Sequence, residues 1–394
     1  QPVSADLRAS TAAGLAIFMG GLGIGGALLG GVADRRRVPL HFYSTLEFGI
    51  AISAALSPLL LGWVRALYIE TGGSYVLGMT GATVLRLALS TLVLGLPTFL
   101  MGGTLPAAAR AAAGRDDTAR TTVALLYGLN TLGAVLGAFI ATFFFIEAFG
   151  TRRTLWLACL LNVLVAIIAR SLSRESTPDL RAAGATVSER SAAPSWFVLT
   201  AAGAVGFAFL LMEMVWYRML GPLLGGSTYT FGLILAVALL GIGLGAAAYA
   251  LWTPRRSPTI LAFASTVALE AVFVAFPWAL GDRLAVVAHT LRGLEALGFY
   301  GHVFGWSVVT SIVVLPAALV SGIQFPMLIA LLGQGSDDVG KHTGRAYAAN
   351  TLGSIGGSLA GGFGALPLLG AVAAWQCVVL VLALLALAAV LLEL

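Results

Sequence analysis

Apolar runs of about twenty residues recur along the whole of this 394-residue chain. As a helix, a run of that length crosses the hydrocarbon core of a bilayer, whereas shorter runs are typical of core helices in soluble proteins. Only 10% of the residues are charged, while a soluble globular domain carries about a quarter. The sequence therefore predicts an all-α polytopic membrane protein with the lipid bilayer as its first partner, and it excludes an ordinary soluble enzyme.

Eleven such runs are bounded by charged residues or by clusters of proline and glycine, and we predict a transmembrane helix for each. They cover residues 12–33, 41–62, 84–112, 120–146, 153–172, 196–220, 228–252, 258–281, 303–332, 344–368 and 370–392.

Basic residues between the runs indicate the orientation of the chain. The net charge is +5, and the cytoplasmic loops of membrane proteins are enriched in Lys and Arg. Arginines are dense at 33–37 and at 110–120, so both joints are predicted to be cytoplasmic, and alternation then places the C-terminus in the cytoplasm. Because topology explains the basic excess, we expect no nucleic-acid partner.

The two halves of the chain repeat one another. Residues 127–150 align without gaps on 347–370, and residues 96–106 align on 315–326 with one inserted residue. Two repeats in the same order, each with an even number of crossings, are typical of transporters of the major facilitator type. We therefore predict two parallel six-helix repeats.

The repeat divides the chain into three parts. Residues 1–172 form an N-terminal bundle of five helices, 173–195 a polar cytoplasmic linker, and 196–394 a C-terminal bundle of six helices. The first bundle has no counterpart of the run 196–220, so we expect the native protein to have one more helix before Gln1.

Two resemblances add to this interpretation. The segment GGVADRRR at 30–37, with its charged residues Asp34, Arg35, Arg36 and Arg37, resembles the cytoplasmic loop motif of the major facilitator superfamily. The segments 101–111, 127–138, 212–245 and 347–362 resemble the membrane portion of the bacterial spermidine-synthase-like proteins. The second resemblance implies a bacterial cytoplasmic (inner) membrane, a polyamine-like cation as ligand, and a cytoplasmic aminopropyltransferase-like domain attached to the membrane part.

No catalytic motif is present in the chain. A nucleoside site needs a strand followed by a glycine-rich turn, whereas the glycine strings at 21–26 and 241–245 lie inside apolar runs. We interpret these glycines as contacts between closely packed helices. The same holds for Gly133, Gly137, Gly353, Gly357 and Gly361. Enzymatic activity is expected only if a soluble domain follows Leu394, and we expect no cofactor and no metal, because the histidines and cysteines lack ligand spacing.

Ionisable residues inside the runs are functional candidates, because a charge in the membrane is costly. Glu47 and Glu270 occupy matching places in the halves, where they could hold an amine or a proton, or simply bond a neighbouring helix. Glu213 and Arg218 are expected to form an ion pair near the outer end of one helix, while Arg86 reaches the outer interface.

Uncharged polar residues repeat as well. Asn130 and Asn350 match one another and either bond across helices or line a cavity. Gln324 precedes Phe325-Pro326, and Thr104 precedes Leu105-Pro106, so both lie at predicted helix breaks. Broken helices at matching places in two repeats indicate a transport site.

The leading hypothesis is the membrane domain of a spermidine-synthase-like protein, which binds or transports a polyamine-like cation or serves the attached enzyme domain. One alternative is a proton-coupled major-facilitator transporter of another small solute. The other is a non-transporting scaffold or accessory subunit of a membrane complex.

Overall fold

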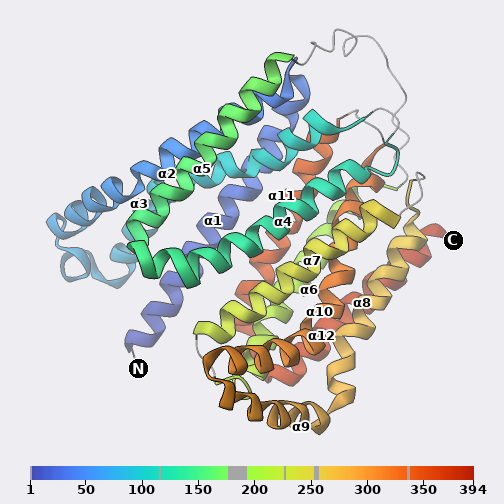
Figure 1. The fold of residues 1–394 in the computed structure, drawn as a ribbon. Coiled ribbons are helices and arrows are strands. Elements are labelled where there is room, and N and C mark those ends of the chain that lie inside the picture. The colour runs from blue at the N-terminus through green and yellow to red at the C-terminus, as the bar shows by residue number, and fades with distance from the viewer. Residues whose placement is uncertain (1, 115–116, 176–192, 226–227, 253–256, 335–337) are drawn as a thin grey trace. The chain divides into compact units, whose positions relative to one another are not determined.

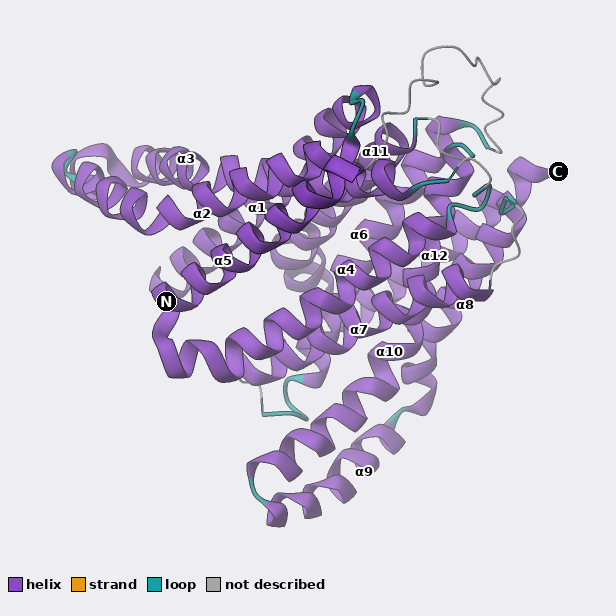
Figure 2. Ribbon diagram, turned by 45° about the horizontal axis from the view of Figure 1, so that its top comes forward, coloured by secondary structure: helices purple, strands orange, loops and turns teal. Residues whose placement is uncertain are grey.

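A computed structural model describes residues 2–114, 117–175, 193–225, 228–252, 257–334 and 338–394. Figure 2 shows that the described residues form helices and loops, with no strand among them. The prediction of an all-α fold is confirmed. Most of the predicted linker, residues 176–192, lies outside the described residues.

Twelve α-helices and three short helical segments follow one another along the described chain (Figure 1). They are α1 (Pro2–Arg35), α2 (Pro39–Glu70), α3 (Gly73–Ala112), α4 (Thr121–Ile140), η1 (Ala141–Phe145), α5 (Ile146–Glu175), α6 (Ser195–Leu220), α7 (Thr228–Trp252), α8 (Ile260–Leu280), α9 (Asp282–Leu291), η2 (Arg292–Leu297), α10 (Phe299–Leu332), α11 (Val339–Leu359), η3 (Ala360–Ala365) and α12 (Leu366–Glu393).

Ten stretches of the described residues are long and apolar enough to cross a membrane. The last of them, Val339–Glu393, has 55 residues, which is enough for two crossings at about 20 residues each. It holds both α11 and α12. The ten stretches therefore correspond to the eleven predicted spans.

The helices group into two compact units. Unit 1 comprises Gln1–Ala112, Ala141–Ser188 and Asp338–Thr351, and so contains α1, α2, α3, α5 and most of α11. Unit 2 comprises Ala113–Ile140, Glu189–Asp337 and Leu352–Leu394. Within unit 2, α10 packs against both α7 and α8, and α8 packs against α12. Sequence order and grouping by contact therefore differ for α4 and for the start of α11.

The repeat predicted from the sequence recurs in the backbone. Gly78 and Gly298, 220 residues apart, have φ of 66° and 79°, and Gly150 and Gly370 have φ of 73° and 79°. A residue with a side chain rarely adopts this left-handed conformation, so glycine permits the same turn in each half. The π-helical segments η1 and η3 also lie at matching places.

Glycines bring the backbones of matching helix pairs together. In unit 1, a Cβ atom on Gly25 of α1 would collide with the carbonyl oxygen of Phe99 in α3. In unit 2, a Cβ on Gly245 of α7 would collide with that of Leu319 in α10. Gly245 and Leu319 each lie 220 residues after their counterparts in the first half, Gly25 and Phe99. The predicted small-residue contacts of the strings 21–26 and 241–245 are confirmed.

The glycine prediction is only half right for the pair α4 and α11. A Cβ on Gly353 or Gly357 would collide with the carbonyl oxygen of Gly203 or Phe207 in α6, and one on Gly361 would lie 3.1 Å from the Met214 side chain. At Gly133 and Gly137, in contrast, a Cβ would meet no described atom within 4 Å. The physical reason is that no described helix takes against α4 the place that α6 takes against α11.

A short helical segment between α8 and α10 was not predicted. It consists of α9 and η2, which follow one another without a break, and its less exposed residues follow an i, i+3, i+4, i+7 pattern typical of an amphipathic helix. These residues are Leu284, Val287, Ala288 and Leu291. The segment is too short and too polar to register as an apolar run.

Candidate functional site

Glu270 is the centre of a buried polar cluster in unit 2. It lies midway along α8, and its side chain is 2% exposed. Gln324 of α10 donates a hydrogen bond from Nε2 to Glu270 Oε2 over 2.7 Å. Ser321, one turn earlier in α10, donates a second hydrogen bond to the same carboxyl group. The cluster therefore joins two helices through a carboxyl group inside a predicted membrane span.

Next to this cluster, α10 lacks one of its backbone hydrogen bonds. Pro326 has no N–H group, so the carbonyl of Gly322, four residues earlier, receives no helical hydrogen bond from it. Gln324 lies between these two residues and is fully buried, and its Oε1 atom has no hydrogen-bond partner among the described residues. A buried polar atom without a partner costs free energy. The cluster therefore keeps an unused acceptor beside the carboxyl group.

At the matching place in unit 1, the described residues form no such cluster. Thr104, which corresponds to Gln324, donates from its hydroxyl to the carbonyl of Met101 in its own helix over 2.8 Å. A hydroxyl that bonds its own helix is a structural group. The two predicted helix breaks therefore differ in chemistry although their prolines match.

Hydrogen bonds from two tryptophans define which residues of α2 and α8 correspond in the two halves. Trp156 donates to the carbonyl of Ala55 over 3.3 Å, and Trp375 donates to that of Val274 over 2.8 Å. Donors and acceptors are both 219 residues apart, as are Pro58 and Pro277 within α2 and α8.

This correspondence corrects the sequence alignment of the two acids. In the corrected alignment Glu47 corresponds to Thr266, and Glu270 corresponds to Ala51. The two acids therefore occupy positions that differ by one helical turn instead of equivalent positions. The physical reason is that four residues make about one turn, so either alignment puts both acids on the same face. Glu47 itself is buried and bonded to Tyr43 one turn earlier in α2. Its predicted pairing with Glu270 concerns two different units and stays a prediction.

The expected ion pair on α6 does not form. Glu213 is buried, Arg218 is exposed, and no ion pair joins them in the described part of the chain. Five residues along a helix correspond to a rotation of about 140°, which points the two side chains to different sides. Arg86 is exposed and donates to the Tyr68 hydroxyl over 2.7 Å, with its guanidinium 5.0 Å from the ring centre.

Asn130 and Asn350 are not brought together within one unit. Asn130 is exposed on α4 of unit 2, between Tyr127 and Thr131. The Tyr127 ring packs against Phe325 of α10 with ring centres 4.6 Å apart. Asn350 is half-buried on the part of α11 that belongs to unit 1. Their roles stay predictions.

The predicted loop motif at 30–37 has a defined structural role in unit 1. Asp34, at the end of α1, accepts hydrogen bonds from the backbone N–H groups of Gly340 and Lys341 over 2.9 and 2.7 Å. These amides begin α11, whose N-terminus attracts negative charge. Arg110 of α3 lies 3.7 Å from the same carboxylate. Asp34 thus ties three helices together, while Arg35, Arg36 and Arg37 are exposed.

The role of Arg120 could not be predicted from the sequence, where this residue is only a topology signal. Arg120 is 1% exposed, and its guanidinium donates to the carbonyl of Ile329 over 3.0 Å. That carbonyl lies in the last turn of α10, where a helix attracts positive charge. Tyr249 of α7 donates to the neighbouring carbonyl of Ala119 over 3.0 Å. The loop before α4 therefore holds the ends of α7 and α10 in unit 2.

No group of three or more metal-ligating side chains occurs among the described residues.

Comparison with known proteins gives a likeness only among solved structures. No family model and no curated protein matches the chain. The crystal structure of the human organic anion transporter MFSD10 (TETRAN) is similar over 97% of this chain and 99% of that chain, at 14% identity and a TM-score of 0.44. The expected membership in the spermidine-synthase-like family is therefore wrong, because no family model and no curated protein of that kind matches the chain.

Proposed function

We propose that the chain is a secondary transporter of the major facilitator type, and that Glu270 binds the proton whose movement drives transport. The observation that carries the proposal is the Glu270 cluster: a carboxyl group inside a membrane span, 2% exposed and bonded to Gln324 beside a proline break in α10. Ionisable groups at such places are costly to bury and mark ion or substrate paths.

The cluster supplies the chemistry that proton coupling needs. An uncharged carboxyl group costs far less to bury than a carboxylate. Glu270 would take up a proton when α8 and α10 enclose it and release the proton when the break in α10 admits water. The unused Oε1 of Gln324 offers an acceptor for the protonated form. Each transport cycle would then move one proton with or against the solute.

The charges of the spans favour a cationic or neutral solute. Glu47, Glu213 and Glu270 are buried within the described spans, while no lysine or arginine there is buried. An anion would meet carboxyl groups and no buried positive partner. We therefore expect the transported solute to be small and to carry either a positive charge or none.

Transport assays on liposomes that contain the full chain and an internal pH-sensitive dye test the proposal. A panel of small cations, neutral solutes and anions is added outside, and we expect at least one cation or neutral solute to move protons. Glu270→Gln should abolish accumulation driven by a pH gradient but keep exchange of labelled for unlabelled solute, because exchange needs no net proton release. Glu70→Gln, at the exposed end of α2, is the matched control.

Two results would contradict the proposal. One is a Glu270→Gln protein that accumulates solute as wild type does. The other is a wild-type protein that, with every solute in the panel, moves no more protons than empty liposomes. Size-exclusion profiles of both variants show whether lost coupling reflects lost folding.

A further inference from the structure

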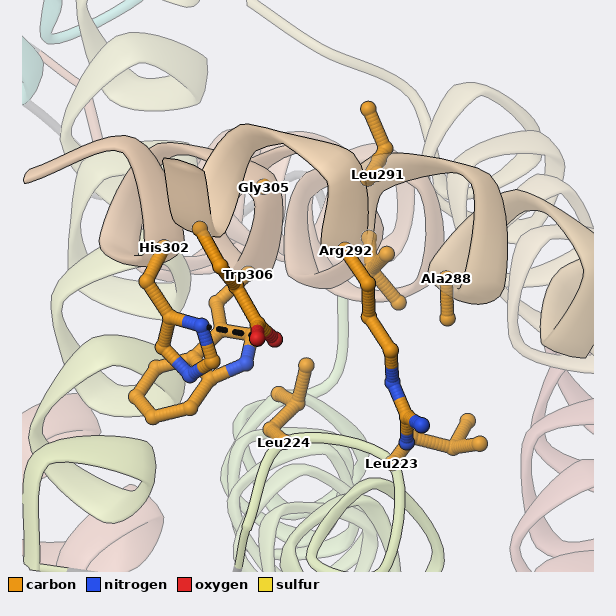
Figure 3. A pocket seen from close by; sticks show the side chains of 10 residues that line it. Leu223, Leu224, Ala288, Leu291, Arg292, His302, Gly305 and Trp306 are labelled. Carbon is orange, nitrogen blue, oxygen red and sulfur yellow. Dashed lines mark ion pairs between the residues drawn. The ribbon is translucent and has the colours of Figure 1, made fainter. Parts of the chain in front are cut away.

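A second candidate site lies in unit 2, where the segment formed by α9 and η2 packs against α10. It is a shallow, partly open cavity, and Figure 3 shows Arg292 to one side of it and His302 with Trp306 to the other. Its remaining walls are mostly apolar. They are formed by Leu223, Leu224, Ala288, Leu291 and Val309.

Opposite charges line this cavity from a single turn of η2. Arg292 and Glu295 are three residues apart in a 3₁₀-helix, and residues at that spacing project from the same side. Arg292 is exposed and has neither a hydrogen bond nor an ion pair within the described residues. Glu295 accepts from Nδ1 of His302 over 3.0 Å. The cavity therefore offers a free cation next to a carboxylate that has one partner and further acceptor capacity.

The other side of the cavity is built by α10. The rings of His302 and Trp306 meet edge to face, with centres 4.0 Å apart, so the histidine is fixed between the indole and Glu295. Gly305 lies between them and is buried. The carboxylate is thereby held at the rim of an apolar space, and its second oxygen can accept another donor.

We propose that this cavity binds the headgroup of a phospholipid that carries a primary amine, with its phosphate on Arg292 and its ammonium on Glu295. Guanidinium groups suit phosphate, because their N–H donors match its oxygens. A primary ammonium donates up to three hydrogen bonds. The site thus complements both charges of a zwitterionic headgroup whose charges a two-carbon linker separates.

The surroundings favour a lipid over a dissolved solute. The same elements expose large apolar side chains: Val286 is 62% exposed, Leu297 73% and Phe304 62%. Trp278 and Tyr300 are exposed nearby in the sequence, as in the aromatic belts of membrane interfaces. The cavity is also shallow and partly open, so it suits a headgroup whose acyl chains lie outside.

Thermal unfolding of the full chain in lipid nanodiscs tests the inference. Discs of phosphatidylcholine alone are compared with discs that also contain phosphatidylethanolamine or phosphatidylglycerol. We expect only phosphatidylethanolamine to raise the melting temperature, because a quaternary ammonium donates no hydrogen bond and glycerol carries no charge for Glu295. Arg292→Gln and Glu295→Gln should each lose this increase. Arg283→Gln, an exposed arginine of α9 that does not line the cavity, should keep it.

Three outcomes would overturn the inference. Equal stabilisation by phosphatidylglycerol would remove the role of the amine. Equal stabilisation of wild type and both η2 variants by phosphatidylethanolamine would place the effect elsewhere. Protection by free phosphoethanolamine or leucine in phosphatidylcholine discs, without phosphatidylethanolamine, would assign the cavity to a dissolved zwitterion. None of these measurements depends on transport, so the result stands apart from the proposed function.

Discussion

Asp117 stabilises the start of α4 by accepting hydrogen bonds from the backbone N–H groups of Thr121 and Thr122, each over 2.8 Å. Burial raises the pKa of Asp117, but the hydrogen bonds from Thr122 and Thr121 outweigh burial, so the pKa lies below its ordinary value of 3.8. The folded protein therefore binds this proton less tightly than the unfolded chain does. The stabilisation is complete above the ordinary pKa and is lost as pH falls through the lower folded value.

Substitutions of Asp117 should lower the stability of the folded protein to different extents. Asp117→Ala removes both acceptors and should cost about 1 kcal/mol at neutral pH, as loss of a helix cap does. Asp117→Asn keeps one acceptor, so it should cost less and should weaken the loss of stability as pH falls below about 4. Thermal unfolding in detergent across this pH range measures both effects.

Asp282, exposed in the first turn of α9, supplies the control. Asp282→Ala should change the melting temperature less than Asp117→Ala does. A melting temperature of Asp117→Ala equal to that of wild type at neutral pH would show that these hydrogen bonds contribute no stability.

Individual candidates could be predicted from the sequence, but their partners could not. Glu270 was identifiable because a carboxyl group in an apolar run is rare. Its partner Gln324 lies 54 positions away, and no local pattern joins the two. Arg120 was missed for the related reason that its acceptor is a backbone carbonyl of another helix, which leaves no mark in the sequence.

At the scale of the helices, matching glycines should respond oppositely to the same substitution. A Cβ on Gly357 would collide with the carbonyl oxygen of Phe207, whereas one on Gly137 would meet nothing within 4 Å. Gly357→Ala should therefore cost about 1–3 kcal/mol by overpacking. Gly137→Ala should be neutral or stabilise by up to about 1 kcal/mol, because alanine favours the helix.

Melting temperatures of the two alanine variants, measured side by side, check this prediction. Because the residues occupy matching positions, each variant controls for the helix propensity of the other. Equal melting temperatures, or a larger loss for Gly137→Ala, would contradict the packing described for α6 and α11.

The spans could be predicted because each is an apolar run, but their ends could not. The sequence predicted that the second run ends at 62 and that the third begins at 84. In the structure α2 continues to Glu70, and α3 already begins at Gly73. Helices that leave the membrane lose the continuous apolar signal. The same reason explains why α9 was missed.

At the scale of the whole molecule, the two compact units exchange segments between the sequence halves. Unit 1 needs Asp338–Thr351 from the second half, and unit 2 needs Ala113–Ile140 from the first. Fragments 1–184 and 185–394 expressed separately should therefore each lack part of a unit and aggregate. Expressed together, they should co-purify as a complex with the melting temperature of the intact chain.

A protease site placed between residues 184 and 185 provides the control. Cleavage after folding should leave both fragments associated, since the contacts within the units are already formed. A C-terminal fragment that is monodisperse on its own and has the melting temperature of the intact chain would contradict this interdependence.

The repeat could be predicted from the sequence, but the family could not. The segments that resembled spermidine-synthase-like proteins include Gly353 and Gly357, whose contacts are with the α6 backbone. Such small-residue patterns arise wherever membrane helices pack closely. They report packing, and the chemistry of the site comes from Glu270 and Gln324, which lie outside those segments.

The one-turn offset between Glu47 and Glu270 bears on the history of the chain. If the halves descend from one duplicated ancestor, the tryptophan bonds are inherited features, since each half has the same donor and acceptor. The two acids are not one shared feature, because Thr266 corresponds to Glu47 and Ala51 corresponds to Glu270. No single ancestral carboxyl group accounts for both. At least one half therefore gained its acid after the duplication, on a scaffold that was already in place.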